Sequence, residues 1–184
     1  MEVESTILKG LILIKPKVFP DDRGFFLETF SADKYKEASV NIVPIQSNHS
    51  RSSKGVLRGL HFQTNPGQAK LMYCPRGKIW DVAVDVRLNS PTYGKYYGVE
   101  LSDKNHWQLF VPVGFAHGFQ VLSDVADVTY IVSNPYNPQT ESGIAYNDPA
   151  IKVPWPLNAI VSGRDKANLL LKDFDWTSTV WQKK

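Results

Sequence analysis

The chain has 184 residues, of which 42% are hydrophobic and 21% are charged. This is ordinary globular composition, which excludes a disordered or collagen-like chain. The net charge of +3 is too small to indicate a nucleic-acid or membrane partner, and the single cysteine, Cys74, excludes a disulfide framework and a cysteine-based zinc site. No apolar run reaches the roughly 20 residues of a membrane span, and residues 1–9 lack the apolar core of a signal peptide. We therefore expect a cytoplasmic protein that binds neither nucleic acid nor membrane.

Glycine, proline and asparagine divide most of the chain into short apolar segments. One helix is expected over residues 32–38, with Ser31 as its N-cap. We expect strands over residues 11–14, 25–30, 42–48, 56–62, 70–74, 78–86, 96–101, 108–111, 118–122 and 125–132. Many short strands separated by turns are typical of an antiparallel sandwich or barrel. The Pro- and Trp-rich segment from residue 149 to residue 184 is expected to lie on the barrel as an irregular arm.

Four ionisable side chains occur inside apolar strand patterns. Lys70 and Tyr130 alternate in step with apolar neighbours, and His61 and His117 lie in apolar runs. Taken singly, each is more often a residue that packs or snorkels. Burying all four in one barrel is costly, so the set predicts a binding site in the barrel mouth.

Arg58 and His61 have opposite parity in a regular strand. A bulge at Gly59 would turn both side chains inward, whereas a regular strand would leave Arg58 in solvent. The spacing fits either arrangement.

Residues 55–63 and 112–117 resemble the two sequence signatures of the cupin jelly-roll superfamily. In metal-binding cupins the first signature carries His-x-His followed by Glu. Here Gln63 stands at the second His position, and no Glu occurs between Glu37 and Glu100. Two of the usual ligands are therefore missing, and we expect no metal.

Longer motifs resemble one particular family of this superfamily. They cover residues 21–30, 46–63, 67–102, 110–124, 136–156 and 162–165. In this order they resemble the dTDP-4-dehydrorhamnose 3,5-epimerase family. The resemblance implies an all-β, antiparallel cupin-like jelly roll that forms a single domain over residues 1–184. It also implies a homodimer with exchanged N-terminal strands, to which about residues 1–48 contribute.

The resemblance implies epimerisation at C3 and C5 of dTDP-4-dehydro-6-deoxy-D-glucose, giving dTDP-4-dehydro-L-rhamnose in dTDP-L-rhamnose biosynthesis. Both protons lie alpha to the C4 ketone, so they can be removed through an enolate without a cofactor. The implied catalytic residues are His61 as base, Asp165 as its carboxylate partner, Lys70 as the cation at the enolate oxygen and Tyr130 as acid.

The resemblance also implies residues that bind the dTDP-sugar: Arg23, Phe26, Glu28, Gln46, Asn48, Arg58, His117, Tyr136, Glu141 and Arg164. Arginine suits the diphosphate because its planar fork donates two parallel hydrogen bonds. Phe25, Phe26 and Tyr136 are candidates to stack on the thymine ring. In the family the strand that carries Arg23 and Glu28 crosses to the other subunit. Arg164 stands where the family usually has lysine.

Three other functions remain open from the sequence. The first is an epimerase of another dTDP-deoxysugar pathway that inverts only C3 or only C5. The second is a metal-dependent cupin sugar isomerase, and the third is a sugar-binding cupin without catalytic activity.

Overall fold

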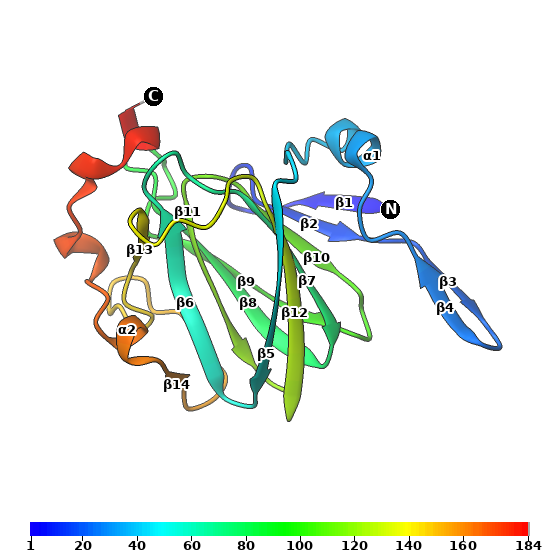
Figure 1. The fold of residues 1–184 in the computed structure, drawn as a ribbon. Coiled ribbons are helices and arrows are strands. Elements are labelled where there is room, and N and C mark those ends of the chain that lie inside the picture. The colour runs from blue at the N-terminus through cyan, green and yellow to red at the C-terminus, as the bar shows by residue number, and fades with distance from the viewer. Residues whose placement is uncertain (184) are drawn as a thin grey trace.

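The computed structural model describes residues 1–183, which form mainly antiparallel strands (Figure 1). One sheet has the strand order β1 (Glu2–Ser5), β2 (Ile12–Lys15), β10 (Gln108–Val111), β7 (Lys70–Arg76), β12 (Val125–Val132) and β5 (Gln46–Ser53). The other has the order β13 (Glu141–Gly143), β6 (Val56–Gln63), β11 (Phe115–Val121), β8 (Lys78–Asp85) and β9 (Tyr96–Ser102), and β14 (Ile160–Val161) pairs in parallel with β6. The pair β3 (Val18–Asp21) and β4 (Gly24–Leu27) forms a separate hairpin.

The helices are short. They are α1 (Ala32–Glu37), α2 (Gly163–Lys166), and the 3-10 helices η1 (Leu171–Asp173), η2 (Trp176–Ser178) and η3 (Val180–Lys183). The expected helix is thus confirmed as α1. Ser31 occupies its N-cap position, but the Ser31 side chain makes no capping hydrogen bond. In the part of the chain that the structure describes, no helix has the length and apolar character needed to cross a membrane.

Two apolar layers lie on either side of the second sheet. Strand β8 shows this, because Ile79 and Ala83 point into the space between the two sheets, whereas Val82 and Val84 point outward. The outward layer is covered by the C-terminal arm through aromatic residues that include Phe174, Trp176 and Trp181. The antiparallel jelly-roll barrel and its irregular arm are therefore confirmed as far as residue 183. Residue 184 lies outside the described part of the chain.

The strand expected over residues 42–48 was partly wrong. Strand β5 begins only at Gln46 and continues through polar residues to Ser53, because all eight of its residues pair with β12. Ile42 instead packs beneath α1, and Val43 and Ile45 are exposed. Strands β1, β3, β13 and β14 were not expected, since they are short and carry little alternation. The strand expected over residues 25–30 ends at Leu27.

Strand β6 contains the bulge that the sequence left open. Opposite β11, His61 pairs with His117 and Arg58 pairs with Phe119, so β6 has one extra residue between the two pairs. Gly59 has a φ of +134°, and a Cβ on it would lie 2.5 Å from the Gly118 Cα. Only glycine fits this close approach of two backbones. The bulge turns both Arg58 and His61 toward one pocket.

The β3–β4 hairpin extends away from the barrel, on the side opposite α2 and the C-terminal arm (Figure 1). It exposes Phe19, Phe25 and Phe26, with 70% of Phe26 accessible. Close to its turn, where Phe25 pairs with Pro20, the centroid of the Phe25 ring lies 4.5 Å from that of the His106 ring. The hairpin therefore presents an apolar surface that its own barrel leaves uncovered.

The barrel interior also encloses one ammonium group. Lys70 is only 9% exposed, and no ion pair within 4.0 Å joins it to a carboxylate of the described residues. Burial lowers the pKa of Lys70 to about 8, although the more distant carboxylates of Glu141 and Asp81 oppose the shift. Burial of the Lys70 amine therefore lowers the free energy of unfolding of the protein.

We predict that Lys70→Met stabilises the protein. A pKa of about 8 in the folded state, against 10.5 for an ordinary lysine, corresponds to about 3 kcal/mol at neutral pH. Between these two values the unfolded chain binds the proton and the folded protein does not, so wild-type stability rises with pH. The advantage of the variant should therefore be full below pH 8 and disappear near pH 10.5.

Thermal unfolding at a series of pH values measures this difference. Lys104→Met is the matched control, because the Lys104 side chain is 91% exposed and its removal should leave the pH dependence unchanged. A Lys70→Met protein that is less stable than wild type at pH 7 would contradict the prediction.

Candidate active site

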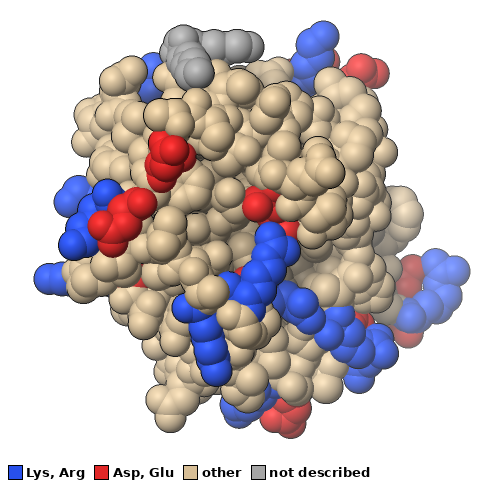
Figure 2. All heavy atoms as spheres, turned by 60° about the vertical axis from the view of Figure 1, so that its left-hand side comes forward, with Lys and Arg blue, Asp and Glu red and all other residues tan. Residues whose placement is uncertain are grey.

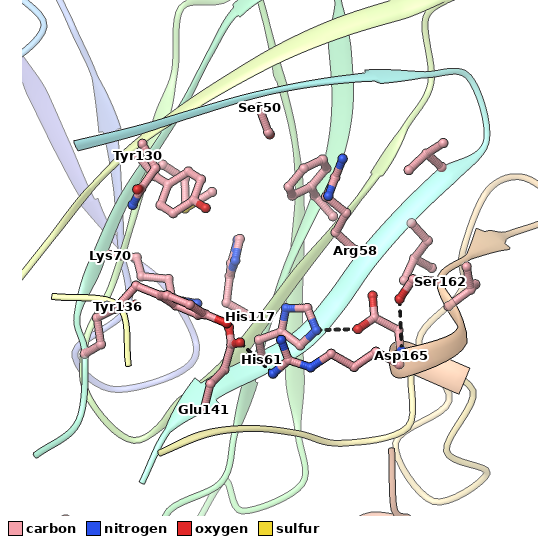
Figure 3. A pocket seen from close by; sticks show the side chains of 18 of the residues that line it. Ser50, Arg58, His61, Lys70, His117, Tyr130, Tyr136, Glu141, Ser162 and Asp165 are labelled. Carbon is pink, nitrogen blue, oxygen red and sulfur yellow. Dashed lines mark hydrogen bonds and ion pairs between the residues drawn. The ribbon is translucent and has the colours of Figure 1, made fainter. Parts of the chain in front are cut away.

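A pocket of about 600 Å³ opens between β5 and β6, with side chains from both sheets facing it (Figure 3). Of the predicted site residues, it is lined by Gln46, Asn48, Arg58, His61, Lys70, His117, Tyr130, Tyr136, Glu141, Arg164 and Asp165. In the view that brings β6, β14 and α2 forward, Lys and Arg side chains gather over the lower centre of the surface (Figure 2). The pocket is therefore lined mainly by polar and ionisable side chains, and Arg58, Lys70 and Arg164 among them suit an anionic ligand.

His61 is held by a carboxylate on one wall of the pocket. Its Nε2 donates to Asp165 Oδ1 at 2.6 Å, which leaves Nδ1 free to accept a proton. Asp165 Oδ2 also accepts from the Gly59 backbone N–H at 3.4 Å. Burial alone would raise the pKa of the Asp165 carboxyl, but its hydrogen bonds, led by that from His61, hold it below its usual value.

Helix α2 fixes the position of Asp165. Ser162 is the N-cap, and its Oγ accepts from the Asp165 backbone N–H at 3.1 Å. The helix lies beside β6 because β14, just before it, pairs with the start of that strand. His61 and Asp165 are 104 residues apart in the sequence, so this local packing is what brings them together.

Tyr130 and Lys70 lie on the opposite wall from His61 (Figure 3). Tyr130 is on β12 and pairs with Met72 of β7, the strand on which Lys70 also lies. Burial raises the pKa of the Tyr130 phenol, so it remains protonated at neutral pH. The pocket thus has an imidazole on one wall and a protonated phenol on the other, with the Lys70 amine nearby.

His117 forms a second pair with a carboxylate. Its Nε2 lies 2.9 Å and 3.0 Å from the two carboxylate oxygens of Asp81, and both side chains are buried. Asp81 was not among the predicted site residues. The alternation of β8 placed it on the same face as Ala83, and that face points into the barrel.

Residues of the pocket rim make two separate sets of contacts. Arg164 Nη2 lies 2.5 Å from Glu141 Oε2. The backbone N–H of Tyr136 donates to Gln46 Oε1 at 3.1 Å, and Gln46 Nε2 donates to Asn48 Oδ1 at 2.6 Å. The side-chain amide nitrogen of Asn48 is therefore left to donate to a ligand.

Three of the predicted binding residues lie outside this pocket. Phe26 is on the exposed hairpin, and Arg23 is beside it with a side chain that is 90% exposed and bonded to Asp21. Glu28 follows the hairpin and pairs with Lys34. None of the three lines the pocket of its own barrel.

The pocket contains polar residues that the sequence did not single out. Ser50 lines it with a buried Oγ that has no hydrogen-bond partner, and Ser162 lies at its edge. Ser50 follows Gln46 and Asn48 at every second position of β5, so correct placement of that strand would have indicated it. Among residues 1–183, no group of three or more His, Cys, Asp and Glu side chains is arranged to hold a metal ion. The expectation that the protein uses no metal stays a prediction.

Comparison with known proteins shows the family. Residues 5–173 match the family model described as dTDP-4-dehydrorhamnose 3,5-epimerase. The enzyme of that name from Neisseria gonorrhoeae is 50% identical over 91% of this chain, which spans 52% of the relative's own length. The Shigella flexneri enzyme is 46% identical over 96% of this chain and 99% of its own. A dTDP-4-dehydrorhamnose 3-epimerase from Streptomyces niveus is also similar, with 39% identity over 94% of this chain and 85% of its own.

A solved structure agrees over nearly the whole chain. It is dTDP-6-deoxy-D-glucose-3,5-epimerase from Legionella pneumophila in complex with dTDP-4-keto-L-rhamnose. The two structures align with a TM-score of 0.94 at 44% identity, covering 97% of this chain and 96% of the other. The chain therefore belongs to the dTDP-4-dehydrorhamnose 3,5-epimerase family, which is a family of isomerases.

Proposed function

We propose that this pocket epimerises C3 and C5 of dTDP-4-dehydro-6-deoxy-D-glucose, giving dTDP-4-dehydro-L-rhamnose for dTDP-L-rhamnose biosynthesis. The observation that carries the proposal is the placement of a His–Asp pair and a tyrosine on opposite walls, with a buried lysine between the sheets. Inversion of a carbon needs removal of a proton on one face and its return on the other. The two walls of the pocket supply a group for each face.

His61 is the proposed base. Its Nδ1 takes the proton from the carbon next to the ketone, and the electron pair of the C–H bond moves to the C4 oxygen as an enolate. Asp165 stabilises the imidazolium that results, and the Lys70 ammonium stabilises the enolate oxygen. A charge aimed at the oxyanion from a desolvated position acts more strongly than one in water.

Tyr130 is the proposed acid. Its phenol donates a proton to the opposite face of the enolate carbon, and the C4 ketone forms again. Because the Tyr130 proton is lost and His61 gains one, exchange with solvent must reset both groups before the next inversion. The raised pKa of Tyr130 favours the protonated form that this step requires.

The nucleotide part is assigned to the remaining polar groups of the pocket. Arg58 donates its Nε to Ser52 at 3.1 Å, and its terminal N–H groups remain for the diphosphate. Gln46, Asn48 and His117 line the same pocket and would add polar contacts, and Tyr136 at the rim would stack on the thymine base. Glu141 and Arg164 complete the wall near the sugar.

A homodimer completes the proposed site. We infer that the β3–β4 hairpin packs on a second copy of the chain, since Phe19, Phe25 and Phe26 on it are all exposed. Exposed Val43, Ile45 and Tyr136 beside the pocket offer an apolar surface for such an arm. Arg23, Phe26 and Glu28 would then reach the pocket of the partner. Residues 1–184 would act as one jelly-roll domain, and the cytoplasmic location stays a prediction.

The reaction is tested by incubation with dTDP-4-dehydro-6-deoxy-D-glucose in deuterated water. We expect deuterium at both C3 and C5 of the product, because each proton is exchanged through the enolate. Deuterium at one carbon only would favour a single-centre epimerase, a second candidate that the similarity to the Streptomyces niveus 3-epimerase supports. Activity that disappears on chelation would instead support a metal-dependent cupin. Binding without any exchange would support a non-catalytic protein.

Variants separate the two proton-transfer groups in the same assay. His61→Ala should lose exchange and product by about 10²–10⁴-fold, as expected for a dominant general base. Tyr130→Phe should keep exchange at a carbon that His61 deprotonates, but should lose product because no acid serves the other face. Full product formation by Tyr130→Phe would remove Tyr130 from the acid role.

Subunit complementation tests the exchanged arm. Arg23→Ala and His61→Ala proteins are each expected to be impaired, and they are mixed after reversible dissociation. If Arg23 serves the partner's pocket, half of the dimers are mixed and each has one intact site, so activity returns to about a quarter of wild type. No recovery above the sum of the two parent proteins would show that Arg23 does not act across the interface.

A further inference from the structure

The carboxylate of Glu141 lies near two cations, and it pairs with only one of them. The Glu141 side chain is 14% exposed, so its charge needs a partner. Arg164 Nη2 is 2.5 Å from Glu141 Oε2, whereas the Lys70 ammonium is not within 4.0 Å of that carboxylate. Figure 3 shows Lys70, Tyr136 and Glu141 on the same side of the pocket.

We propose that Arg164 is a positioning residue that holds the Glu141 carboxylate away from Lys70 and so leaves the Lys70 ammonium uncompensated for the enolate. The inference rests on the proposed role of Lys70 as the cation at the C4 oxygen. It gives Arg164 and Glu141 a role besides contact with the substrate, because their ion pair leaves the Lys70 ammonium without a carboxylate partner.

The geometry of α2 makes Arg164 suitable for this task. Arg164 precedes Asp165 directly, and Ser162 caps the helix through the Asp165 backbone, so the guanidinium starts from a fixed backbone. The Glu141 carboxylate raises the pKa of Arg164, and the nearby Tyr136 adds to the effect. A guanidinium can bond to both partners at once through its planar fork.

Lys70 responds to several charged groups around it. Glu141 on β13 and Asp81 on β8 both act to raise its pKa, against the larger effect of burial. Other titratable or charged groups of the same pocket are Arg58 and His61 on β6, His117 on β11, Tyr130 on β12, Tyr136 at the rim and Asp165 on α2. Glu141 acts on two cations, because it raises the pKa of Lys70 and forms an ion pair with Arg164 at the rim.

Loss of Arg164 would therefore redistribute charge inside the pocket. Glu141 would turn to Lys70, whose pKa it already raises from a distance. The Lys70 ammonium would then be neutralised by an ion pair, and it would attract an enolate oxygen less strongly. At the same time the ion pair would make its proton harder to remove.

The test compares the pH dependence of kcat in wild type, Arg164→Met, Arg164→Lys and the double variant Arg164→Met with Glu141→Gln. Arg164→Met should lower kcat at pH 7 by about tenfold or more, since the oxyanion loses part of its stabilisation. The fall of kcat at high pH, which is the alkaline limb of the profile, reports loss of the Lys70 proton. In Arg164→Met this limb should move upward by about one pH unit or more, because the Glu141 carboxylate now stabilises the charged form of Lys70.

The other variants give the direction of the effect. Arg164→Lys keeps a cation on Glu141, so it should retain most of kcat with an unshifted alkaline limb. The double variant removes the competing carboxylate, so it should recover kcat relative to Arg164→Met and return the limb to lower pH. Arg51→Met is the matched control, because it breaks the Arg51–Asp127 pair on the outer face of β5 and should change neither quantity.

A higher KM for Arg164→Met with wild-type kcat and an unmoved alkaline limb would overturn the inference, because Arg164 would then be a substrate contact only. A double variant that is worse than Arg164→Met would also overturn it.

If the wild-type protein does not epimerise the 4-keto sugar, the proposed function fails, but this inference can still be tested through stability. The stabilising effect of Lys70→Met is then measured against pH twice, once in the wild-type protein and once in the Arg164→Met protein. Each comparison gives a pKa for Lys70 in the folded protein. We expect this pKa to be higher when Arg164 is absent, because the Glu141 carboxylate then stabilises the charged form of Lys70. An unchanged Lys70 titration would overturn the inference.

Discussion

Burial of the Lys70 ammonium is the constraint on which the site depends. Removing an ammonium from water without a neighbouring carboxylate is unfavourable, and its pKa falls to about 8 as a result. The fold tolerates this group because the two sheets and the C-terminal arm bury a large apolar surface elsewhere in the protein. The same desolvation makes the charge effective toward an oxyanion. Stability lost at this position is thus linked directly to the chemistry proposed for the pocket.

The two-sheet architecture supplies the two faces that epimerisation needs. Tyr130 belongs to the sheet that carries Lys70, whereas His61 belongs to the opposite sheet. The bulge at Gly59 brings Arg58 and His61 to the same pocket despite their opposite parity, and Asp165 accepts a hydrogen bond from the backbone of that bulge. The His61 imidazole, the proposed base, is therefore oriented next to the bulge of β6.

Much of this site could be predicted because strand alternation is local. The in-step positions of Lys70 and Tyr130 with apolar neighbours placed both inside the barrel, and a bulge at Gly59 was one of two arrangements that the spacing allowed. Contacts between distant segments could not be predicted from the sequence. No local pattern indicates that Asp81 bonds to His117 or that Arg164 pairs with Glu141. Strand β5 was misplaced because its pairing with β12 outweighs the polarity of its residues.

The most direct measurement is titration of the Lys70 amine itself, by NMR of protein with isotope-labelled lysine and assignment through the Lys70→Met variant. A lysine signal that is absent from the variant and titrates with a pKa of about 8 is the predicted result. A value near the ordinary 10.5 would show that Lys70 is hydrated or paired in solution. It would contradict the claim that a desolvated, uncompensated ammonium organises this pocket.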